Sequence, residues 1–344
     1  MCLRIVPPPQ RGFEYSDLSV IPRVSDIRPE DVSISSFITR KIPLSIPFIP
    51  SPMDSVIGFS LAECLLKSGG VPILHPHYEQ REILKDIVKK LKPIVENTNG
   101  SIGLLISPER DYIDSVKNII RNNINIVAID TLHREPHLHF EAIIRIKEAF
   151  PDIQIISGNV VCSEDCEKLI ELGVDAVRVG MTSASVNRGL DITGCGRCQG
   201  SAVYECFNTC QKYGVPIIAD GSISKISEMV IALALGASTV MMGKMFAKME
   251  ESSAERIKEE GLSYKLYRGM SRKDIISNEL TPEGKELRLP VNGTFSTRIY
   301  EWSKILKIAF SRAGCRTIEE LNRKSILEFL DRGVCEYECK GINL

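Results

Sequence analysis

The sequence predicts an α/β fold, a (β/α)8 barrel, from three observations along its 344 residues. Eight short apolar runs recur, segments with the apolar spacing of helices separate them, and polar or glycine residues follow the runs. Continuous apolar runs indicate strands that are buried on both faces, which requires a parallel sheet covered by helices. Eight such units that close on themselves form a barrel. The expected strands are 46–50, 71–75, 102–106, 124–130, 153–159, 176–180, 216–220 and 239–243.

The segments between these runs carry the helices of the predicted barrel. The chain passes from the second strand directly into a helical pattern, so we expect no inserted domain at that point. The expected helices are 59–67, 80–91, 111–122, 140–149, 164–172, 202–213 and 225–235.

After the eighth strand the alternation stops. Residues from about 247 to 297 are polar and predict a long flap without regular structure. Apolar spacing then predicts closing helices over 300–313 and 318–329, followed by a cysteine-containing tail, 332–344. We expect the whole chain, 1–344, to form a single domain.

Composition excludes several classes of partner. The chain is 43% hydrophobic and 25% charged with a formal net charge of −1, which gives no support for binding to nucleic acid or a membrane surface. It contains no apolar run near the roughly 20 residues that span a bilayer, and residues 1–9 lack the pattern of a secretory signal. Eleven cysteines in a chain with an aliphatic core are expected to be reduced, so we predict a cytoplasmic protein.

The expected strands end in residues with polar side chains or in glycines. Barrel enzymes place their sites at the carboxyl ends of the strands, so seven such residues at one rim favour a site over the alternative that these residue types simply terminate strands. They are Ser51, His75, Asp130, Asn159, Gly180, Asp220 and Gly243.

Seven short motifs at these strand ends occur in a fixed order. They are residues 51–56, 68–75, 157–161, 173–180, 218–223, 240–243 and 267–271. With these motifs the chain resembles the IMP dehydrogenase/GMP reductase family from about residue 13 to residue 329. Residues 51–54 look closer to the dehydrogenases, and the ending over 282–290 looks closer to the reductases.

The resemblance implies a purine nucleoside monophosphate as ligand, NAD(P) as cofactor and a homotetramer as assembly. By resemblance, Ser185, Gly221, Gly243 and Tyr267 hold the 5′-phosphate, while Asp220 holds the ribose hydroxyls. Backbone N–H groups in glycine-containing turns beside helix N-termini form anion sites, which agrees with this placement. Met53, Gly269 and Met270 flank the base, Asp130 lies on the dinucleotide side, and further expected substrate-binding residues are Ser51, Asn159, Ser222 and Lys244.

The catalytic loop departs from the family pattern. The family's nucleophilic cysteine lies two residues beyond the phosphate serine, and that position is Asn187, whose amide cannot replace a thiolate. Pro76 occupies the place of the lysine that the reductases carry between two histidines, whereas Glu283 matches the acid of the reductase flap. The sequence therefore predicts a nucleotide site with altered chemistry, and a nucleotide-binding regulatory paralogue without catalysis is an alternative.

Cysteines near the same loop allow three interpretations. Cys195 and Cys198 form a Cys-x2-Cys pair that, with Cys335 and Cys339, would supply four thiolates to zinc or an iron–sulfur cluster acting on the bound nucleotide. Alternatively Cys195 or Cys198 is a relocated nucleophile or redox thiol, or neither has a special role. Cys166 and Cys206 are expected to be small core residues.

The histidines fall into two groups. We interpret His133, His137 and His139 as part of a solvated loop before a helix, in preference to a metal site. His75, at a strand end, is the expected general acid or base because histidine titrates near neutral pH.

Overall fold

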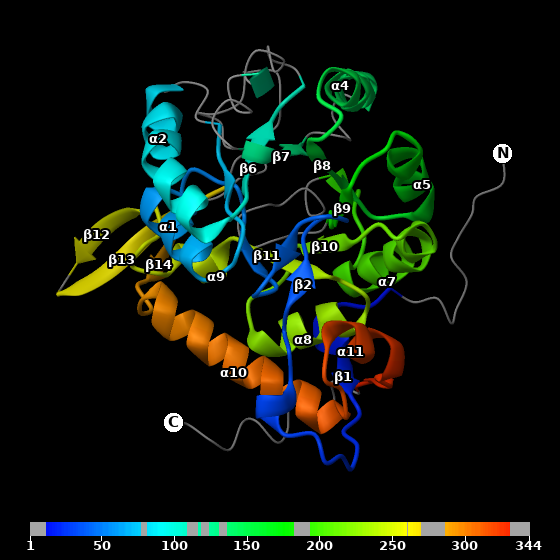
Figure 1. Cartoon of the computed structure of the whole chain (residues 1–344). Coiled ribbons are helices and arrows are strands. Elements are labelled where there is room, and N and C mark those ends of the chain that lie inside the picture. Colours follow the sequence, from blue (N-terminus) through cyan, green and yellow to red (C-terminus); the bar gives the residue numbers. More distant parts are fainter. Residues whose placement is uncertain are drawn as a thin grey trace.

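Eight parallel strands form one sheet in the computed structural model, which describes residues 12–76, 81–108, 116–117, 124–130, 136–181, 193–259, 261–269 and 286–330. The strand order is β4-β11-β10-β9-β8-β7-β6-β5. β4, the first barrel strand in the chain, therefore pairs with β11, the last, and the sheet curls into the predicted (β/α)8 barrel (Figure 1). The strands are β4 (Phe48–Pro50), β5 (Ile73–Leu74), β6 (Ile102–Ile106), β7 (Ile124–Ile129), β8 (Gln154–Val160), β9 (Ala176–Val179), β10 (Ile217–Asp220) and β11 (Thr239–Met242).

Helices surround these strands (Figure 1). The expected helix 111–122 lies mostly outside the described residues. Residues 75–80 are all that separate β5 from α2, so the prediction of no inserted domain is confirmed. None of the helices among the described residues is long and apolar enough to cross a membrane. The helices are α1 (Phe59–Lys67), α2 (Arg81–Thr98), α4 (Pro136–Ala149), α5 (Ser163–Glu171), α7 (Gln199–Cys210), α8 (Ile226–Ala234), α9 (Lys244–Ala247), α10 (Phe295–Ala313) and α11 (Ile318–Lys324), with short 3-10 turns η1 (Tyr15–Asp17), η2 (Pro29–Asp31) and η4 (Gln211–Tyr213).

The interior of the barrel is filled by aliphatic side chains. Each strand contributes inward residues, and a hairpin formed by β2 (Ser36–Phe37) and β3 (Pro43–Leu44) adds Ile38, Ile42 and Leu44 to the same cluster. Full burial of each isoleucine or leucine contributes roughly 1.5–3 kcal/mol relative to an exposed side chain. The strand residues of this inner core are Ile49, Ile73, Leu105, Ile126, Ala128, Ile156, Ala176, Ile218 and Met241, and Val71, just before β5, joins them.

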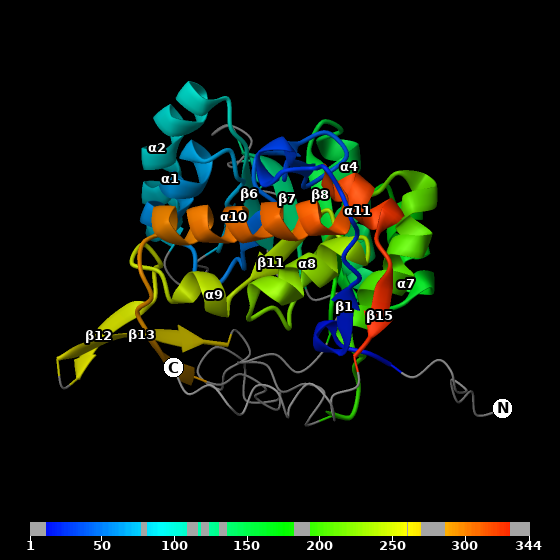
Figure 2. The same cartoon turned by 90° about the horizontal axis from the view of Figure 1, so that it is seen from below.

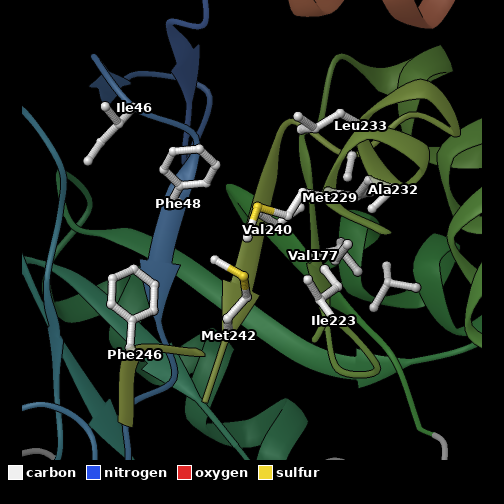
Figure 3. Packing of buried hydrophobic residues seen from close by; sticks show 14 of the residues in the cluster. Ile46, Phe48, Val177, Ile223, Met229, Ala232, Leu233, Val240, Met242 and Phe246 are labelled. Atoms are coloured by element: carbon white, nitrogen blue, oxygen red, sulfur yellow. The ribbon is translucent and has the colours of Figure 1, made fainter. Parts of the chain in front are cut away.

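A second core lies between the barrel and its helices. Outward-facing Val240 and Met242 of β11 pack toward residues of α8, including Met229 and Leu233 (Figure 3). On the other side of β11, Trp302 of α10 makes edge-on ring contacts with Phe48 and Phe246, at centroid distances of 5.6 Å and 5.4 Å. These contacts fix α10 along the outside of the barrel (Figure 2).

The two predicted closing helices are present as α10 and α11, but two details of the predictions for the last third of the chain are wrong. The segment 247–297 contains an antiparallel sheet of β12 (Glu255–Glu259), β13 (Leu262–Arg268) and β14 (Glu286–Pro290), and α10 already begins at Phe295. The helix expected over 318–329 stops at Lys324, and β15 (Leu327–Phe329) follows it. β15 pairs with β1 (Leu18–Val20), where Phe329 also meets Phe13 at 5.4 Å. Pairing across the whole chain length overrides the local helical spacing.

Candidate active site at the barrel mouth

The structure places the seven polar and glycine residues predicted at strand ends at or next to the carboxyl ends of barrel strands, as expected. Three strands meet at Asp220, the last residue of β10. Its Oδ2 accepts a hydrogen bond from Asn159 of β8 at 3.0 Å and another from Arg178 of β9 at 2.7 Å. The carboxylate is thereby held in a fixed orientation at the rim.

Arg178 is a residue whose role the sequence did not reveal, because it lies inside an apolar run. Its side chain is buried, and its guanidinium lies between two carboxylates, Asp220 at 2.7 Å and Asp130 at 3.8 Å. Burial alone would lower the pKa of Arg178, but the charges of Asp220 and Asp130 outweigh burial and raise it. Its Nε and Nη1 are buried without a hydrogen-bond partner among the described residues.

The predicted phosphate and base residues gather beside β11. Gly243 follows β11, and a Cβ at this position would lie 2.2 Å from the hydroxyl oxygen of Tyr267, so a larger residue would have to displace Tyr267. Tyr267 of β13 is buried, its hydroxyl lies 3.8 Å from the sulfur of Met53, and burial followed by the charge of Asp220 raises its pKa. The structure therefore brings three sequence-predicted residues into contact.

Turn geometry completes this side of the mouth. Gly221 and Ser222 follow β10 with φ of 114° and 56°, a left-handed turn directly after Asp220. Lys244, the first residue of α9, is half-buried next to Gly243. Ser51 is buried after β4, where its N–H donates to the carbonyl of Met242 at 3.0 Å.

The segment that contains Gly269 is fastened to the loop after β4. Arg268 Nη2 forms an ion pair with Asp54 Oδ2 at 2.9 Å, and the Arg268 N–H donates to Ser55 Oγ at 3.2 Å. These two contacts join the end of β13 to the loop after β4, which contains Met53; the base-flanking roles of Met53 and Gly269 stay predictions.

Gln199 is a second residue that the sequence did not reveal. Its side-chain amide donates to the carbonyls of Val179 at 2.9 Å and Asp220 at 3.2 Å, while its backbone N–H donates to Glu14 at 3.0 Å. Gly180 leaves room for this side chain, because a Cβ there would lie 2.5 Å from Gln199 Nε2 and 2.1 Å from the Asp220 carbonyl oxygen. Its position at the start of a helix after a polar loop was the available signal.

Six predicted residues lie outside the described part of the chain, and their roles stay predictions. They are Ser185, Asn187, Met270, Glu283, Cys335 and Cys339.

The two cysteines of the Cys-x2-Cys pair have different surroundings. Cys195 is exposed, whereas Cys198 is half-buried with its sulfur against Gly12, where an added Cβ would lie 3.0 Å away. Burial, followed by the charge of Glu14, raises the pKa of Cys198, which disfavours a thiolate there. Across the described residues no group of three or more His, Cys, Asp or Glu is arranged to hold a metal ion. Cys166 and Cys206 are fully buried core residues, as expected.

The histidine prediction needs one correction. His139 is fully buried in α4, where its Nε2 lies 2.6 Å from Ser157 Oγ and its Nδ1 lies 3.2 Å from the carbonyl oxygen of Asp130. The expectation of a solvated loop is therefore wrong for His139, because α4 already begins at Pro136. His137 is exposed, His133 lies outside the described residues, and His75 is half-buried directly after β5.

Comparisons with known proteins agree with this arrangement. The family model described as IMP dehydrogenase / GMP reductase domain matches residues 12–337. The inosine-5′-monophosphate dehydrogenase of Aquifex aeolicus is 26% identical over 92% of this chain and 92% of its own, and that of Borreliella burgdorferi is 28% identical over 92% and 93%. The corresponding enzyme of Chlorobaculum tepidum is 32% identical over 70% of this chain and 53% of its own. On this match across nearly its whole length, the chain belongs to the IMP dehydrogenase/GMP reductase family.

Proposed function

We propose that the barrel mouth binds a purine nucleoside monophosphate with its ribose hydroxyls on Asp220. The observation that carries the proposal is the fixed carboxylate of Asp220, held at the rim by Asn159 and Arg178. Both of these hydrogen bonds end on Oδ2, so Oδ1 is the oxygen that ribose hydroxyl groups would approach.

The phosphate would lie over the turns after β10 and β11. Gly221, Ser222, Gly243 and Lys244 would supply backbone N–H groups and one ammonium group there, and Ser185 is the predicted fifth member. Each hydrogen bond to a charged phosphate oxygen contributes about 1.5–3 kcal/mol. Tyr267 supports the turn, since its hydroxyl fills the space beside Gly243.

A second ligand, a nicotinamide dinucleotide, would bind on the Asp130 side. Arg178 lies between Asp130 and Asp220, and its buried Nε and Nη1 could donate to a polar group of a ligand placed between the two carboxylates. Relatives across nearly the whole chain are named inosine-5′-monophosphate dehydrogenases, which supports oxidoreductase chemistry on a purine nucleotide.

The chemical step needs a group other than the family's cysteine, because Asn187 occupies its position. His75 and Glu283 are the proposed acid–base groups, and Cys195 or Cys198 is the proposed thiol. Exposed Cys195 is the better of the two, because burial raises the pKa of Cys198. We also expect the family's homotetramer and a reducing, cytoplasmic setting, and the eight described cysteines are all free.

Calorimetric titration with IMP and GMP tests the nucleotide site. We expect binding of at least one of them, and Asp220→Asn should weaken it about tenfold or more, because one charged acceptor is lost. Asp152→Asn changes an exposed aspartate in the same way and should leave affinity unchanged. Absence of binding by IMP, GMP and XMP would reject the proposal.

A second candidate is a nucleotide-binding regulatory subunit without turnover. It is favoured by Asn187 and by Pro76, two positions where the residues of the family mechanism are replaced. Absorbance at 340 nm during incubation of IMP with NAD+ or NADP+, and of GMP with NADPH, separates the two. Turnover would exclude the regulatory subunit, and tight nucleotide binding without turnover would favour it.

A further inference from the structure

We infer that His139 is a positioning residue for Asp130 and acts from behind the barrel wall. His139 lies on α4 in the layer between the helices and the strands, and it is fully buried. It therefore touches no ligand itself. The inference rests on the proposed function in one respect, the assignment of Asp130 to the dinucleotide side.

The contacts of His139 determine its tautomer. The carbonyl oxygen of Asp130 only accepts hydrogen bonds, so Nδ1, which lies 3.2 Å from it, carries the hydrogen. Nε2 of the neutral ring then accepts from the hydroxyl of Ser157 at 2.6 Å. Ser157 is also fully buried, and a charged ring between these elements would carry a large desolvation cost.

His139 completes the fixation of the Asp130 backbone. The N–H of Asp130 donates to the carbonyl of Ile106 at 3.2 Å, and its carbonyl accepts from His139. With both backbone groups held, the side chain leaves the end of β7 in one direction. That direction brings the carboxylate to 3.8 Å from Arg178, while it stays 36% exposed at the mouth.

These contacts form a ring of polar groups around the end of β8. His139 joins Ser157 to Asp130, Asp130 pairs with Arg178, Arg178 with Asp220, and Asp220 returns to Asn159, two residues beyond Ser157. Asp220 is held twice within the ring, whereas Asp130 depends on His139 for the orientation of its carbonyl. Loss of the His139 contact should therefore disturb the Asp130 side and spare the Asp220 side.

Two substitutions separate the two contacts of the ring. The amide nitrogen of asparagine lies near the place of Nδ1, so His139→Asn keeps a donor toward Asp130 and loses Ser157. Glutamine carries its amide near the place of Nε2, so His139→Gln keeps Ser157 and loses Asp130. Exposed His137, two residues earlier in the same helix, provides the control His137→Gln.

Calorimetry with NAD+ and with IMP is the first test. We expect His139→Gln to lower NAD+ affinity about five- to tenfold, the loss of one hydrogen bond, while IMP affinity changes less than twofold. His139→Asn should retain most of the NAD+ affinity, and His137→Gln should retain all of it. Equal losses in both His139 variants, or equal losses for NAD+ and IMP, would show a merely structural role and overturn the inference.

Nitrogen-15 spectra of the histidine rings are the second test, and they do not depend on any ligand. One of the five histidines should show the Nδ1–H tautomer, and this signal should vanish in His139→Gln and shift in Ser157→Ala. An Nε2–H ring at His139 would overturn the inference.

A wild-type protein that binds no NAD+ would reject the dinucleotide part of the proposed function without deciding the role of His139. The Arg178 guanidinium signal then decides it, because Asp130 lies beside that group. The signal should move in His139→Gln and stay in place in His139→Asn, and the reverse pattern would overturn the inference.

Discussion

Two carboxylates flank Arg178, and they are held very differently. Asp220 has a side chain that is 15% exposed, with hydrogen bonds of 2.7 Å and 3.0 Å from two strands. Asp130 is 36% exposed and lies 3.8 Å from the same guanidinium. The comparison shows a mouth in which Asp220 is held by two short hydrogen bonds, whereas Asp130 lies farther from Arg178 and is more exposed.

Removing Arg178, the cation that both carboxylates share, is expected to change the free energy of unfolding most. Arg178→Met leaves Asp220 buried without its charged partner, and breaking a buried ion pair costs about 3–5 kcal/mol of unfolding free energy. Urea denaturation measures it. Arg145→Met removes a surface arginine paired with Glu141 and should cost less than about 1 kcal/mol. Similar costs for the two variants would contradict the description of Asp220 as the more firmly held carboxylate.

Gly243→Ala tests whether side chains are packed equally tightly at the proposed phosphate site, which lies on the same side of the mouth as Asp220. The backbone at Gly243 has φ of −89°, which any residue adopts, so the cost is steric and comes from Tyr267. Overpacking of this kind costs about 1–3 kcal/mol, and we expect a lower melting temperature with weaker binding of IMP. Tyr267→Phe in the same chain removes the hydroxyl and should restore part of the loss. No rescue would show that the contact is not the cause.

Neutralising each carboxylate in turn sharpens the comparison directly. Asp220→Asn should cost about 1–3 kcal/mol of stability, because a buried charged hydrogen-bond acceptor is lost. Asp130→Asn should cost less than about 1 kcal/mol, as expected for a partly exposed ion pair. Denaturation curves measured side by side decide this, and a larger cost for Asp130 would reverse the description of the two carboxylates.

The half-buried ion pair of Arg197 and Glu205 gives the smallest expected effect. Arg197 lies 2.5 Å from Glu205, and this hydrogen bond is the main cause that lowers the pKa of Glu205. A lowered carboxyl pKa contributes stability above the ordinary value and loses it as the pH falls through the folded value. Glu205→Gln should therefore destabilise by about 0.5 kcal/mol at pH 7. The difference should begin to shrink below about pH 4.3, the ordinary glutamate pKa, and should disappear only below the lowered pKa of folded Glu205.

Sequence periodicity was sufficient to predict the strands of the barrel, but it did not predict the strands that lie outside it. Buried strands such as Ile102–Ile106 are continuous apolar runs, and α1 has the bounds that its spacing predicts, because local burial determines both. β15 has no such signal, since its partner β1 lies at the other end of the chain. The β12–β14 sheet is polar on much of its surface, so its alternation does not separate it from a loop.

The site shows the same division. Asp220, Asn159 and Gly243 could be predicted because polar residues and glycine stand out after apolar strands. Arg178 and His139 could not, because each is a polar residue buried among apolar neighbours, and its partners come from other elements.

The hairpin of β2 and β3 has a consequence for how ligands enter and leave the barrel. Its Ile38, Ile42 and Leu44 plug the base of a barrel whose lumen is already occupied by aliphatic side chains. Among the described residues, the lumen is filled and its amino-terminal end is covered, so a ligand of the barrel would bind and leave at the carboxyl ends of the strands. If two ligands bind at this one opening, the ligand that lies deeper has to bind first and be released last.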